Sequence, residues 1–311
     1  MPERRKWAAI LAGGDGTRLR AFTRLMAGDE RPKQFCRLFG RDSLLNETRA
    51  RLCLNVEPDH TVCVVSKPHE SFYRSELSDL RRSHLIEQPS NRGTTAAIAA
   101  ALMRVRQLAG DGVVGFFPAD HYYRDVCALR RTVAAAYSAA QADPQRVYLI
   151  GAEATEPEIE YGWIQPGERL DVPRVSPTRR PAVRAVEAFH EKPSMPAALD
   201  LLQRRCLWNT FILVGALGTF DELIAAHAPQ VWDAFSVAEA TGADDAPLLS
   251  TVYAALASSD FSRDVISAAP ERLGVVTLPG SGWTDLGQPS RVLDVLADRG
   301  LRPPRLRLAA S

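Results

Sequence analysis

Short apolar runs and longer amphipathic segments alternate along the first half of the chain. Runs of strand length include WAAILA at residues 7–12, TVCVVS at 61–66 and GVVGFFPA at 112–119. Between the last two, TTAAIAAALMRVRQLA at residues 94–109 has apolar positions at helical spacing. Strands that alternate with helices predict parallel β-α-β units whose helices cover both faces of a sheet. The pattern therefore predicts an α/β fold.

After Ile150 the apolar runs become shorter and are interrupted by glycine and proline. Such pieces predict hairpins and edge strands, which we expect to form a smaller β-rich lobe over the main sheet. Helical segments follow from Thr219 to about Ala257 and again over residues 288–298. The predicted fold is a Rossmann-like, mixed and mostly parallel sheet flanked by helices, with this lobe added. The short pieces are YGWIQPG, AVRAVEAFHEKP, LWNTFILVGAL and LGVVTLPG.

The length of the chain and the lack of a linker favour one domain. The chain has 311 residues, and no repeat or linker separates two cores. We expect a single domain over residues 1–300. It consists of a first half, 1–150, and a second half, 151–300, which includes the C-terminal helices, and a tail follows at 301–311.

Charge and cysteine content narrow the range of partners. The formal net charge is +1, which gives no bulk attraction to nucleic acid or membranes, so we expect neither as a partner. An apolar fraction of 46% excludes disorder across the whole chain. The five cysteines contain no C-x-x-C pair, which argues against a zinc site or a disulfide framework and favours a reducing cytoplasm. No stretch approaches the roughly 20 apolar residues of a membrane-spanning helix.

Glycines and positive charge lie together in the loop after the first predicted strand. Gly13, Gly14 and Gly16 allow positive φ and carry no side chain, so successive amide groups can converge on phosphate oxygens. Arg18 follows the glycines, and Lys33 lies fifteen residues after Arg18. Cations beside such a backbone can neutralise charge on a phosphoryl or nucleotidyl group during transfer. The expected ligand is therefore a triphosphate or pyrophosphate.

Two familiar phosphate-binding motifs do not fit this loop. A P-loop ends in Gly-Lys-Ser/Thr, whereas Arg18 follows Thr17 here. A dinucleotide fingerprint G-x-G-x-x-G beginning at Gly14 would need glycine at position 19, which is Leu19. The pattern that remains is G-G-x-G-T-R-L followed by P-K-Q-F.

This loop and several later segments resemble the signatures of sugar-phosphate nucleotidyltransferases. LAGGDGTRL with RPKQF carries the resemblance, and the Gln-Phe after the lysine is most similar to the mannose-1-phosphate guanylyltransferases (GDP-mannose pyrophosphorylases). The resemblance continues in the family's order through NRGTTAAIA, FPADHY, EYGWI, FHEKP, WNT and GWTDLG, so it covers nearly the whole chain. It implies that the protein makes GDP-mannose and pyrophosphate from GTP and mannose-1-phosphate, by Mg²⁺-assisted in-line attack on the α-phosphorus.

The resemblance assigns the first half of the chain to the nucleotide. It implies that Arg18 and Lys33 are catalytic cations that stabilise the transition state. A solvated surface lysine is the alternative for Lys33. The residues implied to bind the nucleotide are Leu11, Ala12, Gly13, Gly14, Asp15, Gly16, Thr17, Arg92 and Thr94.

Two aspartates are expected to hold Mg²⁺. Asp120 in FPADHY ends an apolar run, and Asp285 in GWTDLG matches the family's second metal-binding aspartate. Mg²⁺ prefers oxygen ligands and usually keeps several waters. The alternatives are a helix cap for Asp120, a role that suits Asp125 better, and a turn carboxylate for Asp285. His121 lacks the cluster that a metal site requires, so we expect it to be a structural hydrogen-bond partner.

The resemblance assigns the second half to the sugar phosphate. It implies that Glu191 in FHEKP accepts hydrogen bonds from sugar hydroxyls and that Lys192 meets the phosphate. Asn209 in WNT and the backbone of Tyr161 and Gly162 would complete the pocket. An exposed ion pair at a strand end is the alternative for Glu191 and Lys192.

Several positions depart from the family pattern. Gly93 stands where asparagine is usual, Thr95-Ala96 replaces alanine-proline, and Phe211 stands where glycine commonly follows W-N-S/T. These departures leave open another NDP-sugar pyrophosphorylase, acting on glucose-1-phosphate with UTP or dTTP. A non-catalytic paralogue that binds a nucleotide sugar is a further alternative, although the expected catalytic and metal residues are all present. The expected protein is cytoplasmic, with GTP and mannose-1-phosphate as small-molecule partners and a homodimer as the assembly to test.

Overall fold

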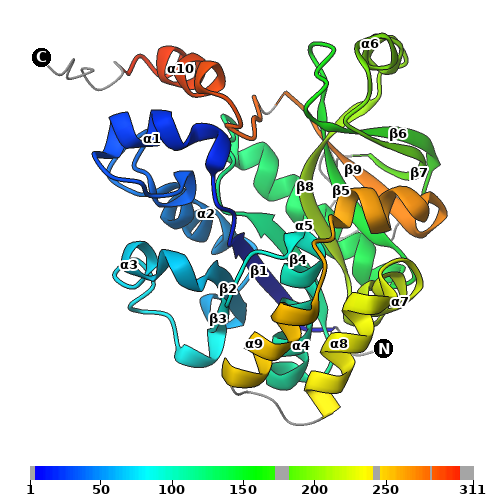
Figure 1. The fold of residues 1–311 in the computed structure, drawn as a ribbon. Coiled ribbons are helices and arrows are strands. Elements are labelled where there is room, and N and C mark those ends of the chain that lie inside the picture. Colours follow the sequence, from blue (N-terminus) through cyan, green and yellow to red (C-terminus); the bar gives the residue numbers. More distant parts are fainter. Residues whose placement is uncertain (1–3, 172–181, 241–245, 281, 302–311) are drawn as a thin grey trace, which may run out of the picture.

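One mixed sheet runs through the described part of the chain (Figure 1). The computed structural model describes residues 4–171, 182–240, 246–280 and 282–301. In these residues nine strands form a sheet in the order β3-β2-β1-β4-β8-β5-β9-β7-β6, with an additional pairing between β8 and β6. The strands are β1 (Lys6–Ala12), β2 (Thr61–Ser66), β3 (Leu85–Gln88), β4 (Val113–Pro118), β5 (Val147–Glu153), β6 (Gly162–Arg169), β7 (Val183–Glu191), β8 (Leu207–Ala216) and β9 (Leu273–Leu278).

Helices surround this sheet. The helical segments that the sequence predicted between Thr219 and Ala257 are α7, α8 and α9, and the last predicted helix is α10. None of the described helices combines the length and the hydropathy needed to cross a membrane. The α-helices are α1 (Arg20–Ala27), α2 (Leu44–Leu52), α3 (Glu70–Tyr73), α4 (Gly93–Ala109), α5 (Val126–Ala142), α6 (Met195–Gln203), α7 (Leu217–His227), α8 (Pro229–Ala240), α9 (Ala246–Ala255) and α10 (Pro289–Asp298).

Parallel and antiparallel pairings occupy different parts of the sheet. Strands β3, β2, β1 and β4 pair in parallel, and so do β5 and β9. Strand β8 pairs antiparallel with both β4 and β5, and the β6–β7 hairpin adds antiparallel pairings to β8 and β9. The expected mixed α/β sheet flanked by helices is therefore confirmed, while parallel order is confined to β3-β2-β1-β4 and the β5–β9 pair.

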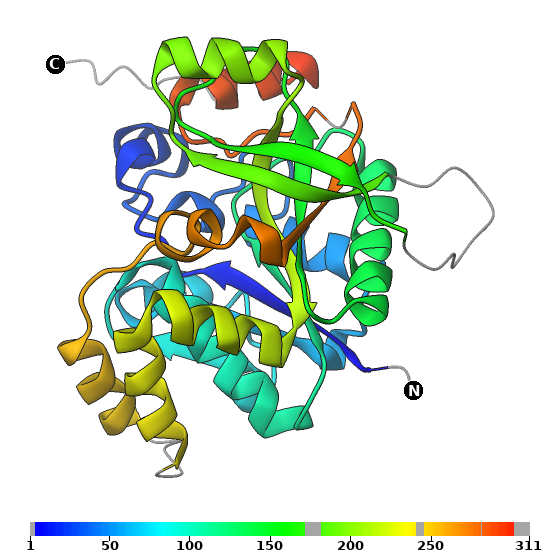
Figure 2. The same ribbon diagram turned by 90° about the vertical axis from the view of Figure 1, so that its right-hand side faces the viewer.

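Residues of β1 alternate between two cores, which explains its uninterrupted apolar run. Ala9 packs in a core with residues of α4, whereas Ala8 and Ile10 pack in a second core with residues of α5. Helix α4 contacts β1, β2 and β3, and α5 contacts β4, β5, β8 and β9 (Figure 2). All three side chains are fully buried. A strand that is covered on both faces shows no alternation of apolar and polar residues.

The carboxyl ends of β1 and β4 lie side by side, which brings two expected site segments together. The strands pair in parallel with Leu11 opposite Pro118, so the chain leaves both strands at the same edge of the sheet.

Asp125 caps α5, because its carboxylate accepts a hydrogen bond from the Ala128 amide at 2.8 Å. The predicted cap is thus confirmed, and Asp120 lines a cleft at this edge.

A backbone bridge brings a late segment of the chain to the same edge. Tyr122 and Thr284 form an isolated antiparallel bridge with N···O distances of 3.0 and 3.2 Å. Thr284 lies between β9 and α10. The bridge therefore sets Asp285 close to the residues that follow β4.

The β-rich second half extends the sheet. Strand β7 pairs with β9, and β6 pairs with β7 and β8, so this hairpin is part of the nine-stranded sheet and not a lobe laid over it. Helix α6 lies next to the hairpin in Figure 1. The division at residue 150 stays an expectation. Of the predicted tail at 301–311, only Leu301 lies within the described residues.

Candidate active site

A cleft of about 370 Å³ opens where the loop after β1 meets the residues after β4. It combines polar and apolar walls from both halves of the chain, as ligand sites commonly do. The expected site residues that line it are Leu11, Gly13, Gly14, Arg18, Thr94, Asp120, Tyr161, Gly162, Glu191, Lys192, Asn209 and Asp285.

The three glycines of the first loop meet different steric needs. Gly16 has a φ of 60°, a left-handed conformation that glycine adopts without steric cost. Gly13 and Gly14 do not share this positive φ. A Cβ atom at Gly13 would lie 2.3 Å from Nε2 of Gln88, so a side chain there would require the Gln88 amide to move. Nothing lies within 4 Å of a Cβ at Gly14, which is open to the cleft.

Gln34 fixes the backbone of this loop. Its buried amide nitrogen donates hydrogen bonds to the carbonyl groups of Ala12 at 2.9 Å and Gly14 at 2.8 Å. The sequence analysis assigns Gln34 no role beyond its place in the P-K-Q-F motif. The sequence carries no local signal for this positioning role, because Gln34 lies 20 residues from Gly14 along the chain.

Some expected site residues are not among those that line the cleft. Asp15 accepts a hydrogen bond from Nδ2 of Asn91 at 3.0 Å. Arg92 donates from Nε to the carbonyl of Tyr253 on α9 at 2.8 Å, so its side chain supports α9. Their roles in nucleotide binding stay predictions. The expected residues outside the cleft lining are Ala12, Asp15, Gly16, Thr17, Lys33 and Arg92.

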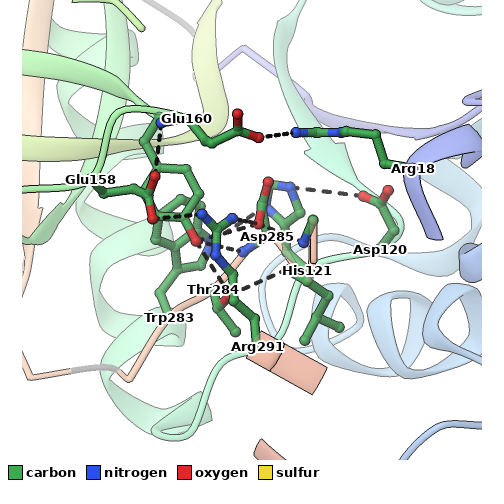
Figure 3. Close-up of polar contacts among 12 residues, drawn as sticks. Arg18, Asp120, His121, Glu158, Glu160, Trp283, Thr284, Asp285 and Arg291 are labelled. Atoms are coloured by element: carbon green, nitrogen blue, oxygen red, sulfur yellow. Dashed lines mark hydrogen bonds and ion pairs between the residues drawn. The ribbon is translucent and has the colours of Figure 1, made fainter. Parts of the chain in front are cut away.

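Arg18 extends toward Glu160 (Figure 3). Its Nη1 lies 2.5 Å from Oε2 of Glu160, and 58% of the Arg18 side chain is exposed. The amide of Glu160 donates to Oε1 of Glu158 at 2.8 Å. An exposed ion pair contributes little to stability. Arg18 can therefore exchange Glu160 for an anionic ligand at low cost.

Lys33 is buried and joins the two expected metal ligands. Its Nζ lies 3.2 Å from Oδ2 of Asp120 and donates to the carbonyl of Asp285 at 2.6 Å. It also lies 3.4 Å from the carbonyl of Leu286. Only 9% of Lys33 is exposed, so the alternative of a solvated surface lysine is wrong.

Asp285 lies in a dense network of donors (Figure 3). Its Oδ1 accepts from the Gly287 amide at 2.7 Å, Arg291 Nη1 at 2.5 Å and the Tyr161 hydroxyl at 3.3 Å. Burial acts to raise the pKa of Asp285, but the nearby positive groups, Lys33 first, outweigh it and hold the pKa below its usual value. Asp285 is therefore ionised and carries the negative charge that a ligand of a cation needs.

His121 lies beside Asp120 and accepts a hydrogen bond from Trp283. The indole Nε1 donates to Nδ1 of His121 at 3.3 Å, which leaves the imidazole proton on Nε2. That nitrogen lies 3.8 Å from Oδ1 of Asp120. Burial lowers the pKa of His121, which favours the neutral ring. The predicted structural hydrogen-bond role is confirmed.

The expected sugar-phosphate residues gather at the end of β7. Nζ of Lys192 lies 3.3 Å from Oε1 of Glu191, and burial raises the pKa of Glu191 although Lys192 opposes this shift. The Lys192 amide donates to the carbonyl of Tyr161 at 3.2 Å. Oδ1 of the buried Asn209 accepts from the Phe211 amide at 3.0 Å. The five residues expected at the sugar phosphate all line one cavity: Tyr161, Gly162, Glu191, Lys192 and Asn209.

Two of the departures from the family pattern fall in left-handed backbone. Gly93 has a φ of 83°, and a Cβ there would lie 2.2 Å from the carbonyl oxygen of Ser259. Phe211 has a φ of 57°, at a point where β8 shifts register against β5. A bulge explains the conformation, which costs a residue with a Cβ roughly 1–2 kcal/mol. Both positions line the cleft.

A segment between α9 and β9 contributes to the cleft although the sequence did not predict it there. Asp260 and Ser262 line the cleft. The backbone amide of Phe261 donates to Oγ1 of Thr94 at 2.8 Å, which ties this segment to the start of α4. Nothing in the local sequence SSDFSRD distinguishes it from an ordinary polar turn, because the contact joins distant parts of the chain.

Two carboxylates at one cleft suit a hard cation. Asp120 and Asp285 both line it. Within the described ranges, no group of three or more His, Cys, Asp or Glu side chains could hold a metal. An ion at these two residues would take its other ligands from phosphates and water, which is usual for Mg²⁺. The donor set fits such an ion.

Comparisons with known proteins match nearly the whole chain. The profile of the family described as "Nucleotidyl transferase" matches residues 7–299. The chain is 30% identical, over 94% of its length, to the xanthan biosynthesis protein XanB of Xanthomonas campestris pv. campestris. It is 29% identical, over 71% of its length, to a mannose-1-phosphate guanylyltransferase of Escherichia coli. The chain spans only 59% and 46% of the lengths of these two relatives.

A solved structure has a similar fold. The protein described as mannose-1-phosphate geranyltransferase from Thermus thermophilus superimposes with a TM-score of 0.77 and 31% sequence identity. The similarity covers 91% of this chain and 76% of the other.

Proposed function

The chain belongs to the nucleotidyl transferase family, and on that premise we propose that it transfers a nucleotidyl group from a nucleoside triphosphate to a sugar 1-phosphate. The observation that carries the proposal is one cleft lined by the open glycine loop, Arg18, two aspartates and the Glu191–Lys192 pair. A cleft that holds open backbone, cations and carboxylates together suits two charged substrates bound side by side.

The reaction needs no covalent enzyme intermediate. An oxygen of the sugar phosphate attacks the α-phosphorus of the triphosphate in line. A new oxygen–phosphorus bond forms, the bond from the α-phosphorus to the bridging oxygen breaks, and pyrophosphate leaves with that electron pair. The protein contributes position and charge to this step.

The side chains divide the work of binding and charge stabilisation. Amides beside Gly14 donate to phosphate oxygens, and Arg18 exchanges Glu160 for the negative charge that develops during transfer. Lys192 meets the phosphate of the sugar, and Glu191 accepts hydrogen bonds from its hydroxyls. The family resemblance implies these assignments, and the presence of Arg18, Glu191 and Lys192 in the cleft lining supports them.

The two aspartates would hold Mg²⁺ together with substrate phosphates. A bound Mg²⁺ supplies positive charge and Lewis-acid polarisation to the phosphates. Lys33 fixes the carboxylate of Asp120 and the main chain of Asp285, so both residues keep their places at the cleft.

We further propose GTP and mannose-1-phosphate as the substrates. The P-K-Q-F and W-N-T motifs support this choice. So do the names of the Escherichia coli relative and of the Thermus thermophilus structure, which both refer to mannose-1-phosphate. Gly93 and Phe211 are the cleft positions at which a different preference would arise.

A screen of pyrophosphate release tests the proposal. GTP, ATP, UTP, CTP and dTTP are each combined with mannose-, glucose- and fucose-1-phosphate, with and without Mg²⁺. We expect release with GTP and mannose-1-phosphate, dependent on the metal, and a strong loss in Asp120→Asn. Asp298→Asn, which removes an aspartate of α10 paired with Arg124, is the control. Turnover only with UTP or dTTP and glucose-1-phosphate would overturn the substrate assignment. No pyrophosphate release with any pair would overturn the proposed nucleotidyltransferase activity.

A further inference from the structure

Arg291 on α10 contacts three residues of the cleft region that no sequence motif connected to it. Its Nη1 donates to Oδ1 of Asp285 at 2.5 Å, and its Nη2 donates to Oε2 of Glu158 at 2.6 Å. The guanidinium carbon lies 4.4 Å from the ring centroid of Tyr161. Figure 3 shows Arg291 between the two carboxylates. The side chains of Arg291, Asp285 and Glu158 are only 12–16% exposed.

These contacts join segments that are separate along the chain. Glu158 and Tyr161 lie between β5 and the start of β6, whereas Asp285 lies between β9 and α10. The planar guanidinium presents its donors in a fixed fork, so each carboxylate has to lie along one of its N–H directions. Arg291 therefore sets the position of Asp285 relative to the β5–β6 segment.

The backbone beside Asp285 needs such support. Leu286 has a φ of 51°, a conformation that costs a residue other than glycine on the order of 1–3 kcal/mol. Lys33 holds the carbonyl groups of Asp285 and Leu286. Lys33 thus fixes the main chain of this turn, and Arg291 fixes the carboxylate.

The two oxygens of the Asp285 carboxylate have different surroundings. Among the described residues, the hydrogen bonds from Tyr161, Gly287 and Arg291 all end on Oδ1. Asp285 also lines the cleft. With Oδ1 engaged by protein donors, Oδ2 is the oxygen that remains for a ligand.

We propose that Arg291 is a positioning residue: by engaging Oδ1 and the Glu158 carboxylate together, it presents Oδ2 of Asp285 to a divalent cation held with the substrate phosphates. The inference rests on the proposed function for the metal-binding role of Asp285. It assigns α10 a part in the site, through a side chain that is not among those lining the cleft.

The test compares metal binding and metal dependence in three variants. Arg291→Gln removes the fork, Arg291→Lys keeps the charge without the fork, and Glu158→Gln keeps Arg291 but removes its second anionic partner. Mn²⁺ binding in the presence of GTP is measured by electron paramagnetic resonance, and the Mg²⁺ concentration for half-maximal rate is measured with both substrates. Loss of a group that orients a metal ligand typically weakens metal affinity or activity about 10- to 100-fold.

We expect Arg291→Gln to weaken Mn²⁺ binding and to raise the half-maximal Mg²⁺ concentration by at least tenfold. Arg291→Lys and Glu158→Gln should give smaller shifts in the same direction. Arg299→Gln is the matched control, because it removes an exposed arginine that directly follows α10 and leaves the Asp285 network intact. It should leave both metal readouts unchanged.

The outcomes separate this inference from the proposed function. If the wild-type protein turns over substrates but all three variants bind Mn²⁺ and depend on Mg²⁺ like the wild type, the positioning role fails and the proposed function stands. If no substrate pair is turned over but Mn²⁺ binding falls tenfold in Arg291→Gln, the proposed function fails and the positioning role stands. A wild-type protein that binds no Mn²⁺ with GTP overturns the inference. Should Arg291→Gln fail to fold, Arg291→Lys and Glu158→Gln decide between the same outcomes.

Discussion

The ammonium nitrogen of Lys33 lies 3.2 Å from Oδ2 of Asp120. The same nitrogen donates to the carbonyl of Asp285 at 2.6 Å, so one buried cation joins both segments that carry the expected metal ligands. Two neighbouring carboxylates without such a cation would repel each other. A metal ion or phosphate that binds in the cleft therefore meets an Asp120 carboxylate that is already paired with Lys33.

Replacing Lys33 should affect both catalysis and stability. Lys33→Ala is expected to lower kcat about 10- to 100-fold, because Lys33 fixes both residues proposed to hold the metal. It should also lower the free energy of unfolding by about 1–3 kcal/mol, because the Asp285 carbonyl and the Asp120 carboxylate lose a buried partner. Steady-state kinetics and urea unfolding measure the two effects.

Lys67→Ala is the control for the Lys33 variant. Lys67 is 54% exposed and pairs with Glu70 at 3.0 Å outside the cleft, so its loss should change neither quantity by much. An unchanged kcat in Lys33→Ala would remove Lys33 from the catalytic account.

Phe211 offers a test of stored backbone strain. Phe211→Gly and Phe211→Ala both remove the ring, but only glycine relieves the φ of 57°. The glycine variant should therefore be more stable than the alanine variant by about 1–2 kcal/mol, the reverse of the usual order within a strand. Urea unfolding measures this difference. We also expect both variants to change sugar preference more than nucleotide preference, since Phe211 lines the cleft.

Two results would contradict this account of Phe211. Equal stability of the two variants would exclude strain at this position. Unchanged sugar selectivity together with reduced stability would make Phe211 a packing residue, in line with its contact with one of the two main cores.

Gly93 should not tolerate the asparagine that is usual in the family. Gly93→Asn places a Cβ 2.2 Å from the carbonyl oxygen of Ser259, so the segment between α9 and β9 has to move. We expect a clear loss of stability in thermal unfolding, together with weaker nucleotide binding, because Gly93 lines the cleft.

Gly28→Asn is the matched control for Gly93. Gly28 has nearly the same φ, 82°, but nothing lies within 4 Å of a Cβ there. Asparagine tolerates left-handed backbone, so this variant isolates the effect of backbone conformation from the collision. Equal melting temperatures for the two variants would show that the Ser259 contact does not constrain position 93.

Glu191 predicts a particular pH dependence of stability. Burial raises its pKa in the folded protein above the ordinary value of 4.5, against the opposing effect of Lys192. The folded state therefore binds this proton more tightly, and the resulting stability is present at low pH and is lost as pH rises through the folded pKa. The wild type therefore loses this stability as pH rises from about 4 through the folded pKa of Glu191, whereas Glu191→Gln does not. The free energy of unfolding of Glu191→Gln relative to the wild type should rise over this pH range and stay constant above it.

Urea unfolding of both proteins at a series of pH values gives this difference directly. Glu168→Gln, at an exposed position on β6, serves as the reference for loss of a surface carboxylate. A difference between Glu191→Gln and wild type that stays constant or falls with rising pH would contradict the burial of this carboxyl.

Local patterns predicted the elements and the parts of the site that depend on them. The apolar run before Asp120 identified a strand, and the end of a parallel strand predicted a residue at the ligand-binding edge. The glycines of the first loop marked Gly13, Gly14 and Gly16 as positions that allow positive φ, and of these three only Gly16 adopts it. Asp125 was recognisable as a cap because a helix follows it directly.

Contacts between distant segments were beyond such patterns. The Tyr122–Thr284 bridge and the Arg291–Asp285 pair depend on how finished elements pack, and neither leaves a periodic signal in the sequence. The conformation of Phe211 could not be predicted either, because a bulky residue rarely adopts the left-handed backbone seen here. Such exceptions are held by the surrounding structure and concentrate at functional sites.

Phosphorus NMR of the complete reaction tests the central claim most directly. The wild-type protein is incubated with GTP, mannose-1-phosphate and Mg²⁺, and the phosphorus resonances are followed over time. Transfer of the guanylyl group predicts that GDP-mannose and pyrophosphate appear in equal amounts while mannose-1-phosphate is consumed. Formation of GDP and inorganic phosphate without consumption of the sugar phosphate, or no change in any resonance, would contradict the account.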